Sequence, residues 1–225
     1  MSFDPNAALV FVAGSYRTPP GTQTQEIVNP ADLSKVGRIA LCSPAQVTAA
    51  LEPATIAQRA WAALDAKSRA AALHRVADSM ESGAQGQVAE LMTREMGKPY
   101  SEAVGELLNV GSIFRYYAEV ARDDGGFLAG PTAPGSLQYA KYFPYGVTAH
   151  IMPYNFPIVL MAFTVAASLA VGNAVVIKPA PATSLCTLAY MRHFASLPAG
   201  LVSCLTGGAE TAQALIADER VKVVA

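Results

Sequence analysis

Two polar side chains in the middle of the chain follow apolar runs, and each could contact a small molecule. Asn155 lies in the run 153–157, which reads PYNFP and follows the apolar stretch 147–152. Because Pro153 and Pro157 restrict the backbone, the amide of Asn155 has little freedom to lose. A fixed amide beside a reacting carbonyl can stabilise a developing oxyanion. The alternative is structural: Asn155 caps a helix that begins at Pro157.

The second candidate is Lys178, which ends the β-branched run 174–178 and precedes Pro179. A strand buried on both faces brings its last side chain to the carboxyl edge of a parallel sheet, where nucleotides bind. There the ammonium group could donate to a ribose hydroxyl or a phosphate. An ordinary solvent-exposed strand end explains the same lysine equally well. Gly207 and Gly208 could let an adenine approach closely, or could simply form a turn.

These residues need alternating strands and helices to position them. Strands are predicted over 147–152, 174–178, 201–205 and 221–225, and helices over 157–171, 184–196 and 210–217. Strands joined by helical crossovers of this length predict an α/β fold with a parallel, doubly wound sheet. The sequence has neither a Gly-x-Gly-x-x-Gly fingerprint nor a Walker loop, so the pattern alone does not specify a nucleotide.

The preceding residues predict a different layer. Strands and turns are expected over 1–40, and Ser43 with Pro44 predicts the start of a helix. Pro53 indicates a kink or a break in that helix. Further helices are predicted over 65–80, 88–96 and 102–121. Glycines and prolines punctuate the segment 126–145, which indicates a hairpin or an extended excursion.

Composition excludes several classes of protein. Hydrophobic residues make up 52% of the 225 residues and charged residues 15%, so the chain can bury a sizeable core. The formal net charge is −1, without long runs of either sign, and no nucleic-acid or anionic-membrane surface is expected. Cys42, Cys186 and Cys204 have neither metal-site nor disulfide spacing, which favours the reducing cytoplasm. The N-terminus predicts no signal peptide.

The uncharged stretch between Lys141 and Lys178 raises the question of a membrane span. Pro157 and Gly172 limit its helical part to about 15 residues, or roughly 22 Å. A span needs about 20 apolar residues. A buried core helix is therefore the favoured interpretation.

Other side chains that could be taken for chemistry have simpler explanations. Glu95 and Glu102 flank the turn 97–99 and could be read as a carboxylate pair, but a solvated or capping role is expected. Cys186 and Cys204 fall inside a predicted helix and strand, where buried thiols behave as small hydrophobes. The three histidines predict no triad with them.

Several short motifs, in order and at sensible spacings, together resemble the N-terminal half of an aldehyde dehydrogenase. They are Ile27-Val28-Asn29-Pro30-Ala31, Arg94-Glu95-Met96-Gly97-Lys98-Pro99, Arg115-Tyr116-Tyr117-Ala118, Pro144-Tyr145-Gly146-Val147, Pro153-Tyr154-Asn155-Phe156-Pro157, Ala170-Val171-Gly172-Asn173 and Lys178-Pro179. The resemblance covers nearly all of the chain. It implies NAD- or NADP-dependent oxidation of an aldehyde to a carboxylic acid.

The resemblance also implies roles for individual residues. Asn155 corresponds to the side-chain half of the oxyanion hole. The implied cofactor-binding set is Ile151, Met152, Pro153, Tyr154 and Asn155 at the nicotinamide end, and Lys178, Ala180, Pro181, Gly207 and Ala209 toward the adenosine. Tyr154 stands where the family most often has Trp. Pro181 stands where members that prefer NAD often carry Glu, so no carboxylate there would repel a 2′-phosphate and binding of NADP is expected to be tolerated.

The family's general-base Glu and nucleophilic Cys would follow Ala225. The expected organisation is therefore a truncated one: 1–125 as strands and a helical layer, 126–145 as an oligomerisation hairpin, and 146–225 as a partial Rossmann-like segment, without the catalytic domain. The alternative function is a catalytically inactive truncated product or one chain of a split enzyme. The expected partners are an aldehyde and either further copies of the chain or a complementary C-terminal chain, with no nucleic acid and no membrane. An apolar edge at 221–225 predicts an isolated chain that is poorly soluble or oligomeric.

Overall fold

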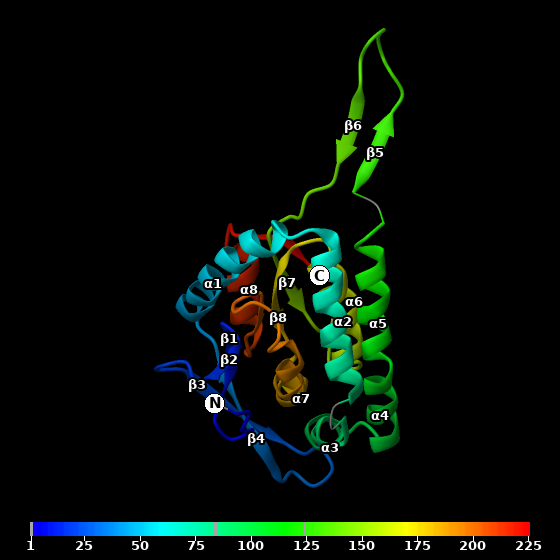
Figure 1. Cartoon of the computed structure of the whole chain (residues 1–225). Helices are drawn as coiled ribbons and strands as arrows, with labels where there is room; N and C mark the ends of the chain where they lie inside the picture. The colour runs from blue at the N-terminus through cyan, green and yellow to red at the C-terminus, as the bar shows by residue number, and fades with distance from the viewer. Residues whose placement is uncertain (1, 83–84, 124) are drawn as a thin grey trace.

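The fold is built around one six-stranded sheet, seen in a computed structural model that describes residues 2–82, 85–123 and 125–225 (Figure 1). The strand order is β10-β7-β8-β9-β1-β2. Its members are β1 (Val10–Val12), β2 (Ser15–Arg17), β7 (Val147–Ile151), β8 (Ala174–Lys178), β9 (Val202–Cys204) and β10 (Val221–Val224). Strands β7 to β10 run parallel, whereas β1 pairs antiparallel with β9 and β2 antiparallel with β1. The predicted parallel α/β sheet is confirmed, and two N-terminal strands extend it.

Helices cover both faces of this sheet. On one face α1 (Pro44–Ala62) and α8 (Ala209–Ala217) pack together, and α6 (Pro157–Ala170) and α7 (Ser184–Tyr190) lie on the other (Figure 1). Two short 3₁₀ segments, η1 (Pro181–Thr183) and η2 (Met191–Phe194), flank α7. The helix predicted over 184–196 is thus an α-helix that tightens into a 3₁₀ turn.

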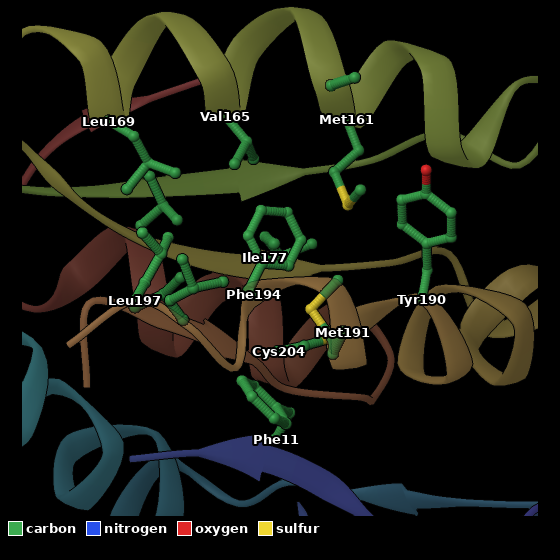
Figure 2. Packing of buried hydrophobic residues seen from close by; sticks show 14 of the residues in the cluster. Phe11, Met161, Val165, Leu169, Ile177, Tyr190, Met191, Phe194, Leu197 and Cys204 are labelled. Carbon is green, nitrogen blue, oxygen red and sulfur yellow. The ribbon is translucent and has the colours of Figure 1, made fainter. Parts of the chain in front are cut away.

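The apolar helix α6 supplies one side of the core. Figure 2 shows Met161, Val165 and Leu169 on the inner side of α6, in the same cluster as Ile177 of β8 and Phe194 of η2. Their four-residue spacing places the three α6 side chains on one helical face. The uncharged stretch is therefore a core helix, as expected. Within residues 2–82, 85–123 and 125–225, no helix is both long and apolar enough to cross a membrane.

The N-terminal helices correct two expectations. The first helix, α1, begins with a capping box between Ser43 and Gln46, as Ser43 predicted. Of the kink or break expected at Pro53, the break is wrong, because α1 continues through this residue. The helix expected over 102–121 is two helices that meet at Asn109, whose side chain donates to the carbonyl of Gly105. Asn side chains compete for backbone hydrogen bonds in this way and interrupt helices. The layer comprises α2 (Ala66–Ser82), α3 (Gln85–Met96), α4 (Tyr100–Leu108) and α5 (Val110–Val120).

Two hairpins lie outside the main sheet. Strands β3 (Gln23–Val28) and β4 (Lys35–Leu41) form one, and β5 (Gly126–Ala129) and β6 (Gln138–Lys141) form the other. The second hairpin projects far from the body of the molecule (Figure 1). Its exposed apolar side chains, with those of the segment that follows, are Phe127, Leu128, Leu137, Tyr139, Tyr142, Phe143 and Tyr145. The expected hairpin excursion is confirmed.

Candidate functional site

The carboxyl ends of β7, β8 and β9 meet at one edge of the sheet. Ile151 pairs with Lys178 across β7 and β8, and the N–H of Met152 donates to the carbonyl of Lys178 at 2.9 Å. The ammonium group of Lys178 donates to the carbonyl of Gly207, just after β9, at 3.0 Å. Four of the predicted cofactor-binding residues, Ile151, Met152, Lys178 and Gly207, are thus brought together.

Lys178 is a buried residue rather than an exposed strand end, so that alternative is wrong. Only 5% of its surface is accessible, and burial lowers the pKa of its ammonium group. Its Nζ also donates to the carbonyl of Pro179 at 2.8 Å, so two of its three N–H groups are engaged. The third is the donor that a ribose hydroxyl or a phosphate at this edge could accept from.

Asn155 lies on the same side of the sheet, in the turn between β7 and α6. Its side chain is exposed, and no hydrogen bond of its amide occurs among the described residues. The N-cap residue of α6 is Phe156, which makes no side-chain capping bond. The capping alternative for Asn155 is therefore wrong, and its amide is free to bind a ligand. Pro153 and Tyr154 of the same turn are exposed beside it.

The N-terminus of α6 is instead capped by Glu106, which the sequence did not single out. Glu106 Oε1 accepts from the backbone N–H groups of Ile158 at 2.8 Å and Val159 at 3.0 Å. Glu106 Oε2 forms a buried ion pair with Lys98. One signal was available: Glu106 falls on the apolar face of its helix, beside Leu107, where an acidic residue needs a partner.

A second buried carboxylate, Glu95 of α3, caps α7. It accepts from the backbone N–H groups of Cys186 at 2.7 Å and Leu185 at 2.9 Å. Burial raises its pKa to about 8, against the opposing effect of these donors. Glu102 is exposed. The expectation of a solvated or capping role for these two residues is confirmed, since Glu95 caps a helix and Glu102 is exposed, and a buried and an exposed carboxylate do not form a pair.

The two glycines after β9 have different surroundings. Gly207 has a φ of +149°, and a Cβ there would lie 2.0 Å from Oγ1 of Thr211. Gly208 has open space on the side where a Cβ would point. Close packing within the protein therefore requires the first glycine, whereas the second leaves room for a ligand. Ala209 begins α8, is exposed and lines a cavity of about 400 Å³ shared with Ser43.

Ala180 and Pro181 follow the end of β8 and are half-buried. The carbonyl of Ala180 accepts from the N–H of Thr183 and the hydroxyl of Ser184, and Pro181 is the first residue of η1. This turn therefore begins with an uncharged side chain close in sequence to Lys178.

The three cysteines are all buried, although Cys42 lines the same cavity as Ala209 and Cys204 is the last residue of β9. Burial raises the pKa of the Cys42 thiol to about 11, and it raises the pKa values of Cys186 and Cys204 further. Each is therefore a neutral thiol near pH 7, as expected for small buried hydrophobes.

Comparison with known proteins supplies the family. A profile of the aldehyde dehydrogenase family matches residues 16–225. Glutarate-semialdehyde dehydrogenase of Pseudomonas putida is 36% identical over 205 residues, which cover 88% of this chain and 42% of that protein. The chain therefore spans less than half the length of this curated relative.

Solved structures agree with this match. An NADP-dependent enzyme of E. coli superposes with a TM-score of 0.92 at 30% identity, over 99% of this chain and 46% of that chain. PnpE in complex with nicotinamide adenine dinucleotide gives a TM-score of 0.91 at 31% identity, over 98% of this chain and 45% of that chain. Sequence and fold lead to the same assignment, and the chain belongs to the aldehyde dehydrogenase family.

Proposed function

We propose that the chain forms the NAD- or NADP-binding portion of an aldehyde dehydrogenase, an oxidoreductase that converts an aldehyde into a carboxylic acid. The observation that supports this most strongly is the carboxyl edge of the sheet, where Lys178 joins the ends of β8 and β9 and the turn after β7 carries the free amide of Asn155. Relatives and similar structures include proteins described with each of the two cofactors.

The residues at this edge fit the dinucleotide. Lys178 has an N–H left for the adenosine ribose, and open space at Gly208 leaves room beside it. We assign the turn 151–155 to the nicotinamide end, where Asn155 donates to the aldehyde oxygen as it becomes an oxyanion. The cofactor, when bound, supplies the hydride acceptor.

The nucleophile must come from residues other than the described cysteines. In the family's chemistry a thiolate attacks the aldehyde and a thioester is hydrolysed. Cys42, Cys186 and Cys204 are buried neutral thiols and cannot do this. This observation favours a second candidate function, in which the chain is catalytically inactive alone or binds cofactor for a complementary chain that carries the nucleophile.

Aldehyde-dependent formation of NAD(P)H by the purified chain, with both cofactors and several aldehydes, distinguishes the two candidates. Turnover that falls about 100-fold in Asn155→Ala, yet persists when Cys42, Cys186 and Cys204 are each replaced by Ser, supports the first candidate with a nucleophile other than these thiols. A folded chain that binds cofactor without turnover supports the second candidate. Turnover that requires Cys186 or Cys204 would contradict the assignment of these thiols.

We further propose that copies of the chain associate through the β5–β6 hairpin. The support is its projection from the body and its exposed apolar side chains (Figure 1).

In this proposal, residues 1–125 and 146–225 act together as one cofactor-binding unit. The unpaired thiols favour a reducing cytoplasmic location.

A further inference from the structure

The turn between α3 and α4 and helix α4 itself have no role in the chemistry proposed above, yet each carries a buried charge, Lys98 in the turn and Glu106 in the helix. Lys98 and Glu106 are 6% and 5% exposed. Such a pair is costly to bury, and removal of either partner leaves an uncompensated charge. The ion pair between Lys98 and Glu106 is therefore expected to hold a neighbouring part of the structure in place.

Glu106 holds the first turn of α6. A helix begins with backbone N–H groups that have no partner inside the helix. The N-cap residue Phe156 supplies no side-chain acceptor, and Glu106 reaches across from α4 to accept from Ile158 and Val159. The carboxylate also lies at the positive end of the α6 dipole. The start of α6 is thus fixed by a residue about fifty positions earlier in the chain.

Lys98 extends this contact to the turn that precedes α6. Its ammonium group pairs with Glu106 and lies 4.1 Å from the centroid of the Phe156 ring. A cation over an aromatic face is attracted to it, more strongly when water is excluded. Phe156 is the neighbour of Asn155, so the backbone on the C-terminal side of Asn155 is held by both Lys98 and Glu106.

We propose that Lys98 and Glu106 are positioning residues, which fix the turn 153–157 so that the Asn155 amide faces the nicotinamide end of the proposed cofactor site. The inference rests on the proposed function for the identity of the ligand. The residues proposed to bind the adenosine end of the dinucleotide are held independently of those proposed to bind its nicotinamide end. Lys178 and Gly207 are held by their own hydrogen bond, without contact to Lys98.

The test compares a dinucleotide with its adenosine half. Binding of NAD+, NADP+, ADP and 2′,5′-ADP is measured by calorimetry for the chain and for Lys98→Met, Glu106→Gln and the double variant. We expect about tenfold weaker dinucleotide binding, as for other residues that orient a binding group, and a less than twofold change for the adenosine fragments. A misfolded variant would lose both. The double variant leaves no unpaired buried charge, so it remains informative if a single variant fails to fold.

Glu95→Gln is the matched control, because Glu95 is also a buried carboxylate that caps a helix, but it caps α7. It should leave the ratio of dinucleotide to fragment affinity unchanged. Amide hydrogen exchange gives a second readout: Ile158 and Val159 should exchange faster in the Lys98 and Glu106 variants than in Glu95→Gln.

Failure of this inference is distinct from failure of the proposed function. A chain that binds no nucleotide at all contradicts the cofactor assignment, and the exchange measurement then decides alone whether the pair positions the turn. Unchanged exchange at Ile158 and Val159, or equal losses for dinucleotide and fragment in folded variants, would overturn the positioning role.

Discussion

At the scale of single residues, ligand binding at the carboxyl edge of the sheet is expected to depend on two polar side chains, the buried Lys178 and the exposed Asn155. Lys178 is fixed by two carbonyl acceptors, whereas Asn155, in the turn that follows the neighbouring strand β7, makes no hydrogen bond through its amide among the described residues. The sequence could predict both candidates because each follows an apolar strand. It could not decide between exposure and burial for Lys178, since the carbonyl of Gly207 is supplied by a segment about thirty residues later.

The side chain at position 181 should influence which dinucleotide binds. Pro181→Glu introduces a carboxylate at the start of η1, close in sequence to Lys178. It would repel a 2′-phosphate, so we expect NADP+ binding to weaken at least about tenfold relative to NAD+, or about 1.4 kcal/mol. Pro181→Gln is the neutral control for competition titrations. An unchanged ratio in Pro181→Glu would show that position 181 lies away from the ribose.

Buried His150 should make the protein sensitive to acid. Its two ring nitrogens contact the hydroxyls of Thr148 and Thr164, both at 2.9 Å, and burial lowers its pKa to about 4. The unfolded chain, with a pKa of about 6.5, takes up a proton first as the pH falls. The contribution of neutral His150 to the free energy of unfolding is thus fully present above about pH 6.5. It is lost as the pH falls toward about 4, and it amounts to up to about 3 kcal/mol.

Urea unfolding at about pH 7 and about pH 5 measures this dependence. His150→Gln, which cannot be protonated, should lose less stability between the two conditions than the unmodified chain. His193 also has a pKa lowered to about 4 and keeps its own contribution in both proteins. An equal loss in both proteins would mean that His150 does not contribute.

At the scale of elements, the turns and helix caps that join strands to helices determine the geometry at the carboxyl edge of the sheet. Periodicity and turn residues predicted α6, α8 and the parallel strands within a few residues. The break at Asn109 and the continuity of α1 through Pro53 were missed, because hydrogen bonds and packing decide such details rather than local propensity. The caps supplied by Glu95 and Glu106 were also hard to predict as specific contacts, because they join helices distant in sequence.

The turn from β9 into α8 offers a paired test. Gly207→Ala would force a Cβ to within 2.0 Å of Thr211 Oγ1 at a φ of +149°. We expect a loss of about 2 kcal/mol or more in the free energy of unfolding, from strain and overpacking. Gly208→Ala, at a φ of −90° with open space around it, should change stability by less than about 0.5 kcal/mol. Equal effects in denaturant unfolding would contradict this account of the turn.

At the scale of the whole molecule, the β5–β6 hairpin stands apart from the body. Leu128 and Tyr139 pair across it and are 70% and 74% exposed. Exposed apolar patches of this kind mark association surfaces. Replacing both residues by Lys should reduce the mass of the assembly measured by light scattering, while thermal unfolding of the body changes little. An unchanged mass, or a monodisperse monomer for the unmodified chain, would contradict association through the hairpin.

Nucleotide binding to the intact chain tests the central claim most directly. Calorimetric titration with NAD+ and NADP+ should show saturable binding of at least one of them. Lys178→Met, with its fold verified by circular dichroism, should weaken that binding about tenfold or more, since a charge-assisted hydrogen bond is lost. If the folded chain binds neither dinucleotide, or if Lys178→Met binds as tightly as the unmodified chain, this edge of the sheet is not the cofactor site.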